Sequence, residues 1–439
     1  MPQANLEPYE TVVVVTDPSG VILAVSATAE TVTGRSRRHL VGSRRSVLAH
    51  PDTPLGLYLH IERELAEAQT SGGYVSFAQA NGRGTWLAVA EVNTATTRVM
   101  VGVAPMRQDY LQTLEPLYER ATATEQAAVA GGASLQAAAA LGAETLDQSI
   151  RELGFSGYRD LTNTAIPAEA LTRQAGYPPV TEGPLAPVWQ GVEELAAQLD
   201  WQTAAQERLF ELSTLLVLGA EDLAVRGDSL SEAAAITADG ARRAGAVVSA
   251  LTSASRVASS CEGAAVALGA LTLGAERCQS LVLEQRSLLA TARLVTQATM
   301  EVVSRERDLE LLPWLAAALG GLGPGLSMGS ARIGAGLTRL AREATDAAGQ
   351  ARVLAGAVAS WELLAARLDL PGAQLPFDAE VGTLGDGLDG LRDMARGAQE
   401  RAREVDPSSY VDAVADLTRI LRRLRYATTA QLAAVGPLL

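Results

Sequence analysis

The first hundred residues of the chain alternate short apolar runs with turn-forming residues. Thr11–Thr16 (TVVVVT) and Val21–Ser26 (VILAVS) are rich in β-branched residues, and Asp17-Pro18-Ser19-Gly20 separates them. This pattern predicts a β-hairpin, because Pro and Gly set the turn and β-branched residues favour strands. Three further strands are predicted at Tyr74–Ala80, Thr85–Asn93 and Arg98–Pro105.

Helical segments are predicted between the second and third strands. Ala27–Thr33 and Arg37–Val41 fit short helices, and the spacing of apolar residues in Leu55–Ala68 predicts an amphipathic helix. The stiff turn His50-Pro51-Asp52-Thr53-Pro54 precedes that helix. The order of elements predicts an α+β domain in which a five-stranded antiparallel sheet carries helices on one face, a layout that resembles a PAS domain.

Beyond Asp109 the pattern predicts helices almost throughout. Leu111–Leu141 is rich in alanine and helical, whereas Gly154–Pro187 contains several prolines and is interpreted as a partly ordered connector. From Val188 to about Leu370 the helical pattern is nearly continuous, and a last helix is predicted at Tyr410–Val435. We therefore divide the chain into a PAS-like sensor domain (1–107), a helical connector that contains Pro and Gly (108–187), a helical rod or hairpin bundle (188–370) and a C-terminal helical segment (371–439).

One stripe in the helical region has the spacing of a coiled coil. Its fifteen positions alternate three and four residues apart, with a single three-residue slip. They are Ala244, Val247, Leu251, Ala254, Ala258, Cys261, Ala265, Leu268, Leu271, Ala275, Cys278, Val282, Gln285, Leu289 and Ala292. We call this set the seam. Its small residues predict closely packed helices and a homodimer or larger homo-oligomer formed through the helical region.

The uncharged run Leu311–Ala331 contains the glycine-rich segment Gly320–Gly325. We interpret this segment as a hairpin bend that precedes a returning helical arm at Ser330–Leu368, in preference to a membrane span, because Gly and Pro would open the backbone to lipid. No integral membrane span is therefore expected.

Composition narrows the classes of function. The 439 residues are 48% hydrophobic but only 4% aromatic, and the formal net charge is −14. An acidic surface disfavours binding to nucleic acid. The two cysteines, Cys261 and Cys278, do not form a disulfide framework, which favours a cytoplasmic location. Both lie on the seam, where they are small buried residues or redox sensors.

Chemistry-bearing motifs are scarce in the sequence. There is no lysine, no G-x-S-x-G sequence and no kinase motif set, and the three histidines lack metal-ligand spacing, so neither an enzyme nor a metal site is expected. The last helix carries Arg419, Arg422, Arg423 and Arg425. This basic face is either solvated or a docking surface for an acidic partner or a membrane.

Four short islands carry a resemblance to a known family. They are His50-Pro51-Asp52-Thr53-Pro54, Asn81-Gly82, Trp86 and Glu115-Pro116-Leu117-Tyr118. In this order they resemble the PAS domain of the bacterial aerotaxis-receptor family, over about a quarter of the chain. The resemblance implies a PAS fold that holds FAD and passes its redox state to a helical hairpin. By matching residues, it places a set of five at or near the flavin pocket: His50, Asp52, Tyr58, Tyr74 and Trp86.

The sequence also departs from that family. Ala49 replaces the motif arginine, Glu62 stands in place of a tryptophan, and Ser26 stands in place of a pocket asparagine. Loss of a cation and of an aromatic wall weakens the binding of an anionic cofactor. We therefore expect no cofactor, or a small molecule, in the PAS core; FAD stays possible, and haem through His50 or His60 is a further alternative.

The helical region resembles a chemoreceptor cytoplasmic domain at Gln285-Arg286-Ser287-Leu288-Leu289-Ala290, but the residues that should follow and contact the coupling protein and kinase are absent. Two hypotheses follow. The first is a non-enzymatic cytoplasmic sensory transducer, in which the state of the PAS domain is coupled to a dimeric helical rod and an unidentified signalling partner. The second is a scaffold or self-assembling interaction protein that uses a cofactor-free PAS domain for docking.

Overall fold

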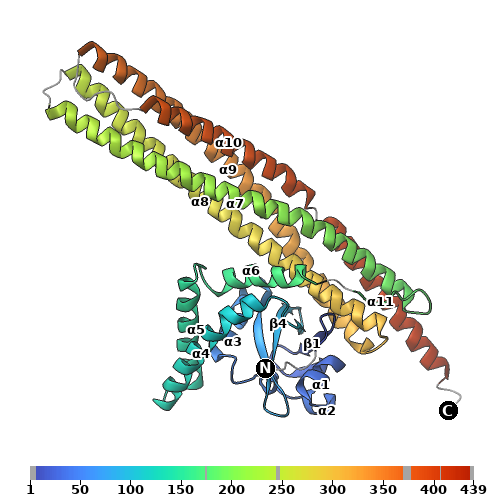
Figure 1. Ribbon diagram of the computed structural model, residues 1–439. Coiled ribbons are helices and arrows are strands. Elements are labelled where there is room, and N and C mark those ends of the chain that lie inside the picture. Colours follow the sequence, from blue (N-terminus) through green and yellow to red (C-terminus); the bar gives the residue numbers. More distant parts are fainter. Residues whose placement is uncertain (1–5, 174–175, 244–247, 369–376, 406, 436–439) are drawn as a thin grey trace. The chain divides into compact units, whose positions relative to one another are not determined.

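The computed structural model describes residues 6–173, 176–243, 248–368, 377–405 and 407–435, and the chain divides into two compact units (Figure 1). The first unit contains Met1–Thr203, Leu283–Met328 and Pro407–Leu439. The second contains Ala204–Val282 and Gly329–Asp406. Each unit has its own hydrophobic core, and each is described separately below.

The first unit contains the five-stranded antiparallel sheet that the sequence predicts. Its strands follow the order β2-β1-β5-β4-β3. They are β1 (Thr11–Thr16), β2 (Ile22–Val25), β3 (Thr70–Ala78), β4 (Gly84–Asn93) and β5 (Arg98–Val103). The only sizeable difference from the prediction is that β3 begins at Thr70 rather than at Tyr74, because the glycine-containing residues before Tyr74 also pair with β4.

The three predicted helices between β2 and β3 are confirmed as α1 (Ala27–Thr33), α2 (Arg37–Leu40) and α3 (Leu55–Ala68). A short 3-10 helix that was not predicted, η1 (Arg45–Leu48), lies between α2 and α3. The Ser26 hydroxyl accepts a hydrogen bond from the backbone N–H of Ala29 at 3.2 Å and so caps α1. Together, sheet and helices form the α+β domain with a PAS-like layout, called the sheet domain below.

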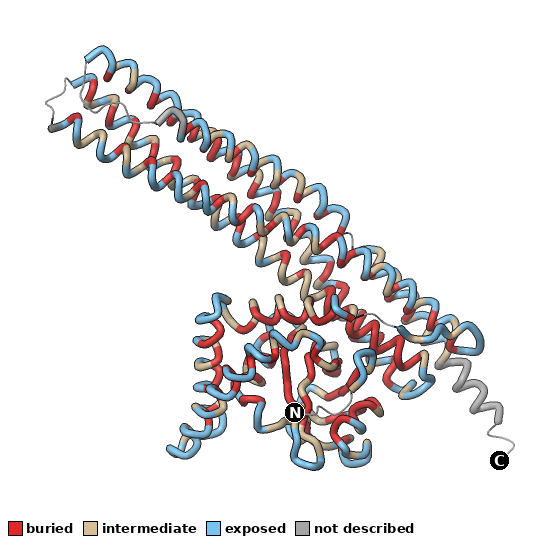
Figure 2. The backbone as a smooth tube through the Cα atoms, in the orientation of Figure 1, coloured by how far each residue is buried: buried red, intermediate tan, exposed pale blue. Residues whose placement is uncertain are grey.

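Both faces of the sheet are covered, which differs from the expectation of helices on one face. All six residues of β1 are buried (Figure 2). Val14 and Thr16 point into a small cavity on the α3 side, whereas Thr11 and Val13 face Val302 on α8 (Val248–Ser304). A strand with two buried faces needs apolar residues at successive positions, which explains the unbroken run TVVVVT.

The predicted connector contains a helix. After α4 (Gln108–Ala130) and α5 (Leu135–Glu152), the chain forms α6 (Tyr158–Leu171). The Tyr158 hydroxyl donates to the Gly72 carbonyl at 2.8 Å, so α6 lies against strand β3. The interpretation of Gly154–Pro187 as a loop-prone connector was therefore wrong for this segment. Pro167 lies inside α6 and the other prolines of this stretch follow the helix, so tertiary packing stabilises α6 in spite of its proline.

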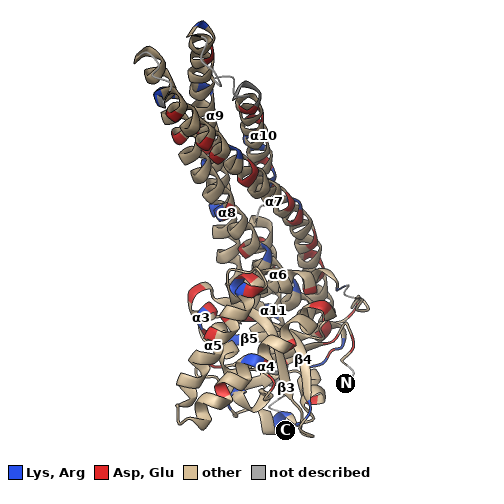
Figure 3. Cartoon of the chain, turned by 60° about the vertical axis from the view of Figure 1, so that its left-hand side comes forward, with Lys and Arg blue, Asp and Glu red and all other residues tan. Residues whose placement is uncertain are grey.

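The remaining helices are long. They are α7 (Ala186–Arg243), α8, α9 (Leu312–Leu368), α10 (Phe377–Glu404) and α11 (Ser408–Val435). Their Arg, Asp and Glu residues are spread along the helices (Figure 3). Two segments, Val248–Ser304 and Leu309–Leu368, are long and apolar enough to cross a membrane, a property that core helices of soluble proteins share.

The predicted hairpin bend at Gly320–Gly325 was wrong, because this segment lies inside α9. The chain reverses instead between α8 and α9, a segment that includes the 3-10 helix η2 (Leu309–Leu311). Glu306 and Asp308 adopt left-handed backbone conformations there, with φ of 48° and 61°. Gly323 of this segment serves close packing, since a Cβ atom on it would lie 3.3 Å from a methyl carbon of Val411.

The seam of α8 is buried by helices of the same chain. In the second unit, Cys261, Leu268, Leu271 and Cys278 are each at most 2% exposed and share one hydrophobic core with residues of α7, α9 and α10. Two seam positions, Ala244 and Val247, lie outside the described residues. The apolar stripe therefore needs no second copy to cover it, and homo-oligomerisation stays a prediction.

Candidate functional site

A cavity lies in the sheet domain at the place where its sheet faces η1 and α3. It measures about 30 Å³, and its polar lining comes from Thr16, Arg45, Tyr58, Glu91 and Arg98. A volume of this size accommodates about one water molecule. The Thr16 hydroxyl oxygen is buried without a hydrogen-bond partner among the described residues, so the cavity wall retains a free polar group.

Four charged side chains form a cluster beside this cavity. Glu91 is 1% exposed, and its carboxylate lies 2.8 Å from the Arg45 guanidinium and 3.9 Å from that of Arg98. Arg98 also donates two hydrogen bonds to Glu62, at 2.5 and 2.9 Å. Two cations and two anions thus compensate each other, which a buried charge requires.

Burial and the charges of the cluster shift the pKa values of Arg45, Glu62 and Tyr58. Burial alone would lower the pKa of Arg45, but the adjacent Glu91 carboxylate outweighs it and the pKa is raised. Burial would raise the pKa of Glu62, yet the hydrogen bonds and charge of Arg98 lower it. Burial raises the pKa of the Tyr58 hydroxyl to about 12, so this group is neutral at physiological pH. The cavity wall therefore offers paired charges and a neutral phenol.

The five residues of the expected flavin site occupy separate environments. Of these, only Tyr58 lines the cavity. The His50 ring lies 3.1 Å from the Asp52 carboxylate and 3.3 Å from the Gly82 carbonyl, at the turn between β3 and β4. Their assignment to a cofactor site stays a prediction.

The remaining two, Tyr74 and Trp86, lie on the face of the sheet opposite to the cavity-lining residues Val75 and Glu91. Neighbouring residues along a strand point to opposite faces, and residues paired across two strands share a face. The Tyr74 hydroxyl donates to Glu169 of α6 at 2.8 Å. Trp86 packs against Tyr118, with 5.8 Å between ring centroids.

The groups present do not fit a flavin or a haem. A cavity of about 30 Å³ is far smaller than the several hundred Å³ typical of cofactor sites. His60 stacks on Tyr158 with 5.1 Å between ring centroids, and its Nε2 lies 3.3 Å from the Ala143 carbonyl. A haem at either His50 or His60 would have to displace these contacts.

A second polar site joins strand β1 to the end of α8. One carboxylate oxygen of Glu301 accepts hydrogen bonds from the Thr11 N–H at 2.7 Å and from the Thr11 hydroxyl at 2.6 Å. Arg305 lies 3.2 Å from the other Glu301 oxygen and 3.2 Å from Glu10. Burial is the largest influence on Glu301 and raises its pKa, although the bonds from Thr11 oppose this effect.

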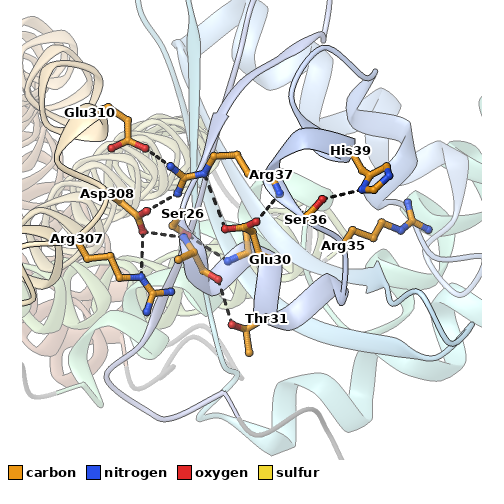
Figure 4. Close-up of polar contacts among 12 residues, drawn as sticks. Ser26, Glu30, Thr31, Arg35, Ser36, Arg37, His39, Arg307, Asp308 and Glu310 are labelled. Carbon is orange, nitrogen blue, oxygen red and sulfur yellow. Dashed lines mark hydrogen bonds and ion pairs between the residues drawn. The ribbon is translucent and has the colours of Figure 1, made fainter.

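The turn after α8 binds the first helix of the sheet domain (Figure 4). Asp308 accepts a hydrogen bond from the Ala27 N–H at 2.7 Å, at the N-terminus of α1. The Arg37 guanidinium forms ion pairs with Asp308 and Glu310 (Figure 4). A carboxylate at a helix N-terminus satisfies a free N–H group and complements the helix dipole. We call Glu301, Arg305 and Asp308, together with Thr11 and Arg37, the α8 junction.

Sequence reasoning missed the charge cluster and the α8 junction. Glu91 interrupts an otherwise apolar strand, which is the one local signal that a buried ion pair was present. Glu301 and Asp308 give no such signal, because their partners Thr11 and Ala27 lie 290 and 281 residues away.

Fold and sites together define an α+β domain of PAS-like layout that is joined to long helices. No protein-family model matches the chain, and no curated protein is significantly similar to it.

Proposed function

We propose that the protein is a non-enzymatic, cytoplasmic sensory transducer in which the state of the PAS-like domain biases the helical region. The observation that carries this proposal is the position of strand β1. Its residues Val14 and Thr16 line the cavity, and Thr11 of the same strand is bonded to Glu301 on α8. A change on the cavity side of β1 would therefore act directly on the end of α8.

The physical basis is the tightness of this contact. Val13 and Val15 are fully buried, and packed interiors transmit displacements because they contain few voids. A shift of β1 would strain the buried Thr11–Glu301 bonds, and α8 can relieve that strain by a small change of position. Coupling of this kind needs no cofactor; a small polar ligand, or a change in the hydration of the cavity, is sufficient.

The partners in this proposal follow from the sequence resemblance to aerotaxis receptors and chemoreceptor cytoplasmic domains. The helical region would form a homo-oligomer and act on an unidentified signalling protein. No integral membrane span is part of this proposal, and neither is nucleic acid. The seam is already covered within the chain, so the contact between copies would use other helix faces.

Hydrogen–deuterium exchange tests the coupling. The variant Val75→Ile adds one methyl group beside the cavity, and Leu65→Met serves as a control because Leu65 is buried in the same domain without lining the cavity. We expect Val75→Ile to change the exchange of peptides that cover Glu301–Asp308, and Leu65→Met to leave them unchanged. In a Glu301→Ala background, which removes the acceptor of both Thr11 bonds, the effect at α8 should disappear. A response of Val75→Ile confined to the sheet would contradict transduction.

A scaffold is the second candidate, and exposed apolar residues on α7 favour it. Leu215, Leu218, Val225 and Ile236 are each more than half exposed, and their spacing places them on one side of the helix. A solvent-facing apolar stripe of this kind is a feature of surfaces that bind other proteins. In a scaffold, the sheet domain would dock to another protein and would not sense a ligand.

Sedimentation tests self-assembly through this stripe. The double variant Leu218→Asp/Val225→Asp should convert a dimer into a monomer, because it places charges on the exposed stripe. The control Leu251→Asp alters the half-buried seam of α8, so it should destabilise the bundle itself and not only the contact between copies. A monomeric wild-type protein at micromolar concentration would exclude a self-assembling scaffold.

A further inference from the structure

A groove lies between α9 and α11 in the first unit, away from both sites described above. Its volume is about 570 Å³, within the range of small-molecule sites. Gly320, Gly323 and Pro324 line it from α9, and Val411 and Val414 line it from α11.

The floor of the groove is mostly apolar. Tyr410 is fully buried, and its hydroxyl donates to the Leu319 carbonyl at 2.7 Å. Gly320 and Gly323 have no side chains that could fill the space above this contact, and Pro324 has no N–H group to present. The groove therefore has a mostly apolar floor with few hydrogen-bonding groups, which suits a hydrocarbon chain.

Two arginines give the groove a polar end. Close contacts pair Gly323 with Tyr410 and Val411, and Gly320 with Val414, so α11 runs antiparallel to α9 here. Arg419 and Arg422 follow farther along α11 and line the same groove. From Val411 to Arg422 the helix rises by about 16 Å, at 1.5 Å per residue.

The charges at this end favour an anion. Arg419 pairs with Asp416 at 2.7 Å, whereas Arg422 forms no ion pair with any residue that the structure describes. Both arginines are exposed, in a chain whose formal net charge is −14. A guanidinium binds carboxylates through parallel hydrogen bonds, so the end of the groove complements a carboxylate.

From these observations we infer that the groove binds a single-chain anionic amphiphile, a long-chain carboxylate. The hydrocarbon chain lies on the floor formed by Leu319, Tyr410 and Val414, and the carboxylate lies against Arg419 and Arg422. Each methylene group removed from water contributes about 0.8 kcal/mol, so chain length dominates the affinity and the arginines set the polarity. This inference is independent of the transducer proposal.

Calorimetric titration of the full-length protein with dodecanoate, below its micelle concentration, is the primary test. We expect one dodecanoate per chain, no binding of acetate, and at least tenfold weaker binding of dodecyltrimethylammonium, which has the same chain and the opposite charge. Absence of dodecanoate binding, or equal binding of the cationic amphiphile, would overturn the inference.

Variants locate the site. Arg419→Gln/Arg422→Gln should weaken dodecanoate binding about tenfold, and the matched control Arg423→Gln should not, because Arg423 is exposed on the same helix but does not line the groove. Ala415→Phe fills the groove from an exposed position and should abolish binding without loss of helicity. The inference fails if Arg423→Gln has the same effect as the double variant, or if binding survives Ala415→Phe.

A second copy of the chain is the other possible occupant of the groove, and sedimentation distinguishes it. Ala415→Phe should leave the sedimentation coefficient unchanged. Conversion of a dimer into a monomer by this variant would assign the groove to an interface between copies and overturn the amphiphile inference.

Discussion

Glu301 and Thr11 are joined by two hydrogen bonds, although 290 residues separate them in the chain. A single carboxylate oxygen accepts both the backbone N–H and the hydroxyl of Thr11, at 2.7 and 2.6 Å. Hydrogen bonds to a charged acceptor are stronger than those between neutral groups, particularly where water is excluded. This pair connects the sheet domain directly to the end of α8.

Replacement of that carboxylate should weaken the connection. We expect Glu301→Gln to reduce the free energy of unfolding by about 1–3 kcal/mol, because the amide retains an acceptor for Thr11 but loses the ion pair with Arg305. Urea denaturation measures the change. Glu10→Gln, which removes the other partner of Arg305, serves as the control and should cost less than about 1 kcal/mol. Equal effects of the two variants would contradict a specific role for the Glu301 carboxylate.

The charge cluster beside the cavity gives a second prediction. Arg45→Met should destabilise the sheet domain by about 3 kcal/mol, because Glu91 would keep a buried charge with its nearest cation removed. The double variant Arg45→Met/Glu91→Gln should recover most of this loss, since the uncompensated charge is gone. Thermal unfolding followed by circular dichroism compares the two, and a double variant less stable than Arg45→Met would show that the charges act through other contacts.

Glu64 makes stability depend on pH. Burial raises the pKa of this carboxyl to about 7, although the Ser71 hydroxyl donates to one of its oxygens at 2.5 Å. The folded protein therefore binds a proton that the unfolded chain, with a pKa near 4.5, has already released. Its contribution is complete below about pH 4.5 and is lost as the pH rises through about 7.

The magnitude of that loss is on the order of 2–3 kcal/mol. Urea unfolding between pH 5 and pH 8 checks it, with Glu64→Gln as the variant that cannot titrate. The wild-type protein should lose stability across this range relative to Glu64→Gln, and parallel curves for the two proteins would contradict the assignment.

A close helix crossing predicts the effect of one methyl group. A Cβ atom on Gly56 of α3 would lie 2.2 Å from the backbone nitrogen of Ala143 on α5, so Gly56→Ala forces two helices apart. We expect a loss of about 3 kcal/mol or more. Gly349→Ala in α9 has open space around the new methyl group and should be neutral, or stabilising by up to about 1 kcal/mol. Thermal unfolding measures both variants, and equal stabilities would refute the crossing.

The sequence alone determined the sheet domain almost completely. Runs such as TVVVVT, the turn at Asp17–Gly20 and the amphipathic spacing of Leu55–Ala68 are local signals, and local signals are sufficient for strands, turns and short helices. The seam of α8 was also readable, since a stripe of small apolar residues must be buried somewhere. Which helices bury it was not encoded in the stripe itself.

Only the tertiary structure decided how distant segments meet. Glycines that predict a bend from the sequence instead permit the close approach of α9 and α11. The reversal falls at Glu306 and Asp308, in a stretch without glycine or proline. The charge cluster around Glu91 and the junction at Glu301 depend on partners far away in the chain. Glu91 in an apolar strand signals a buried charge without indicating its partner, and no local pattern signals the junction. The physical reason is that periodicity reports which face of a helix or strand is buried, whereas complementary shape and charge select what covers that face.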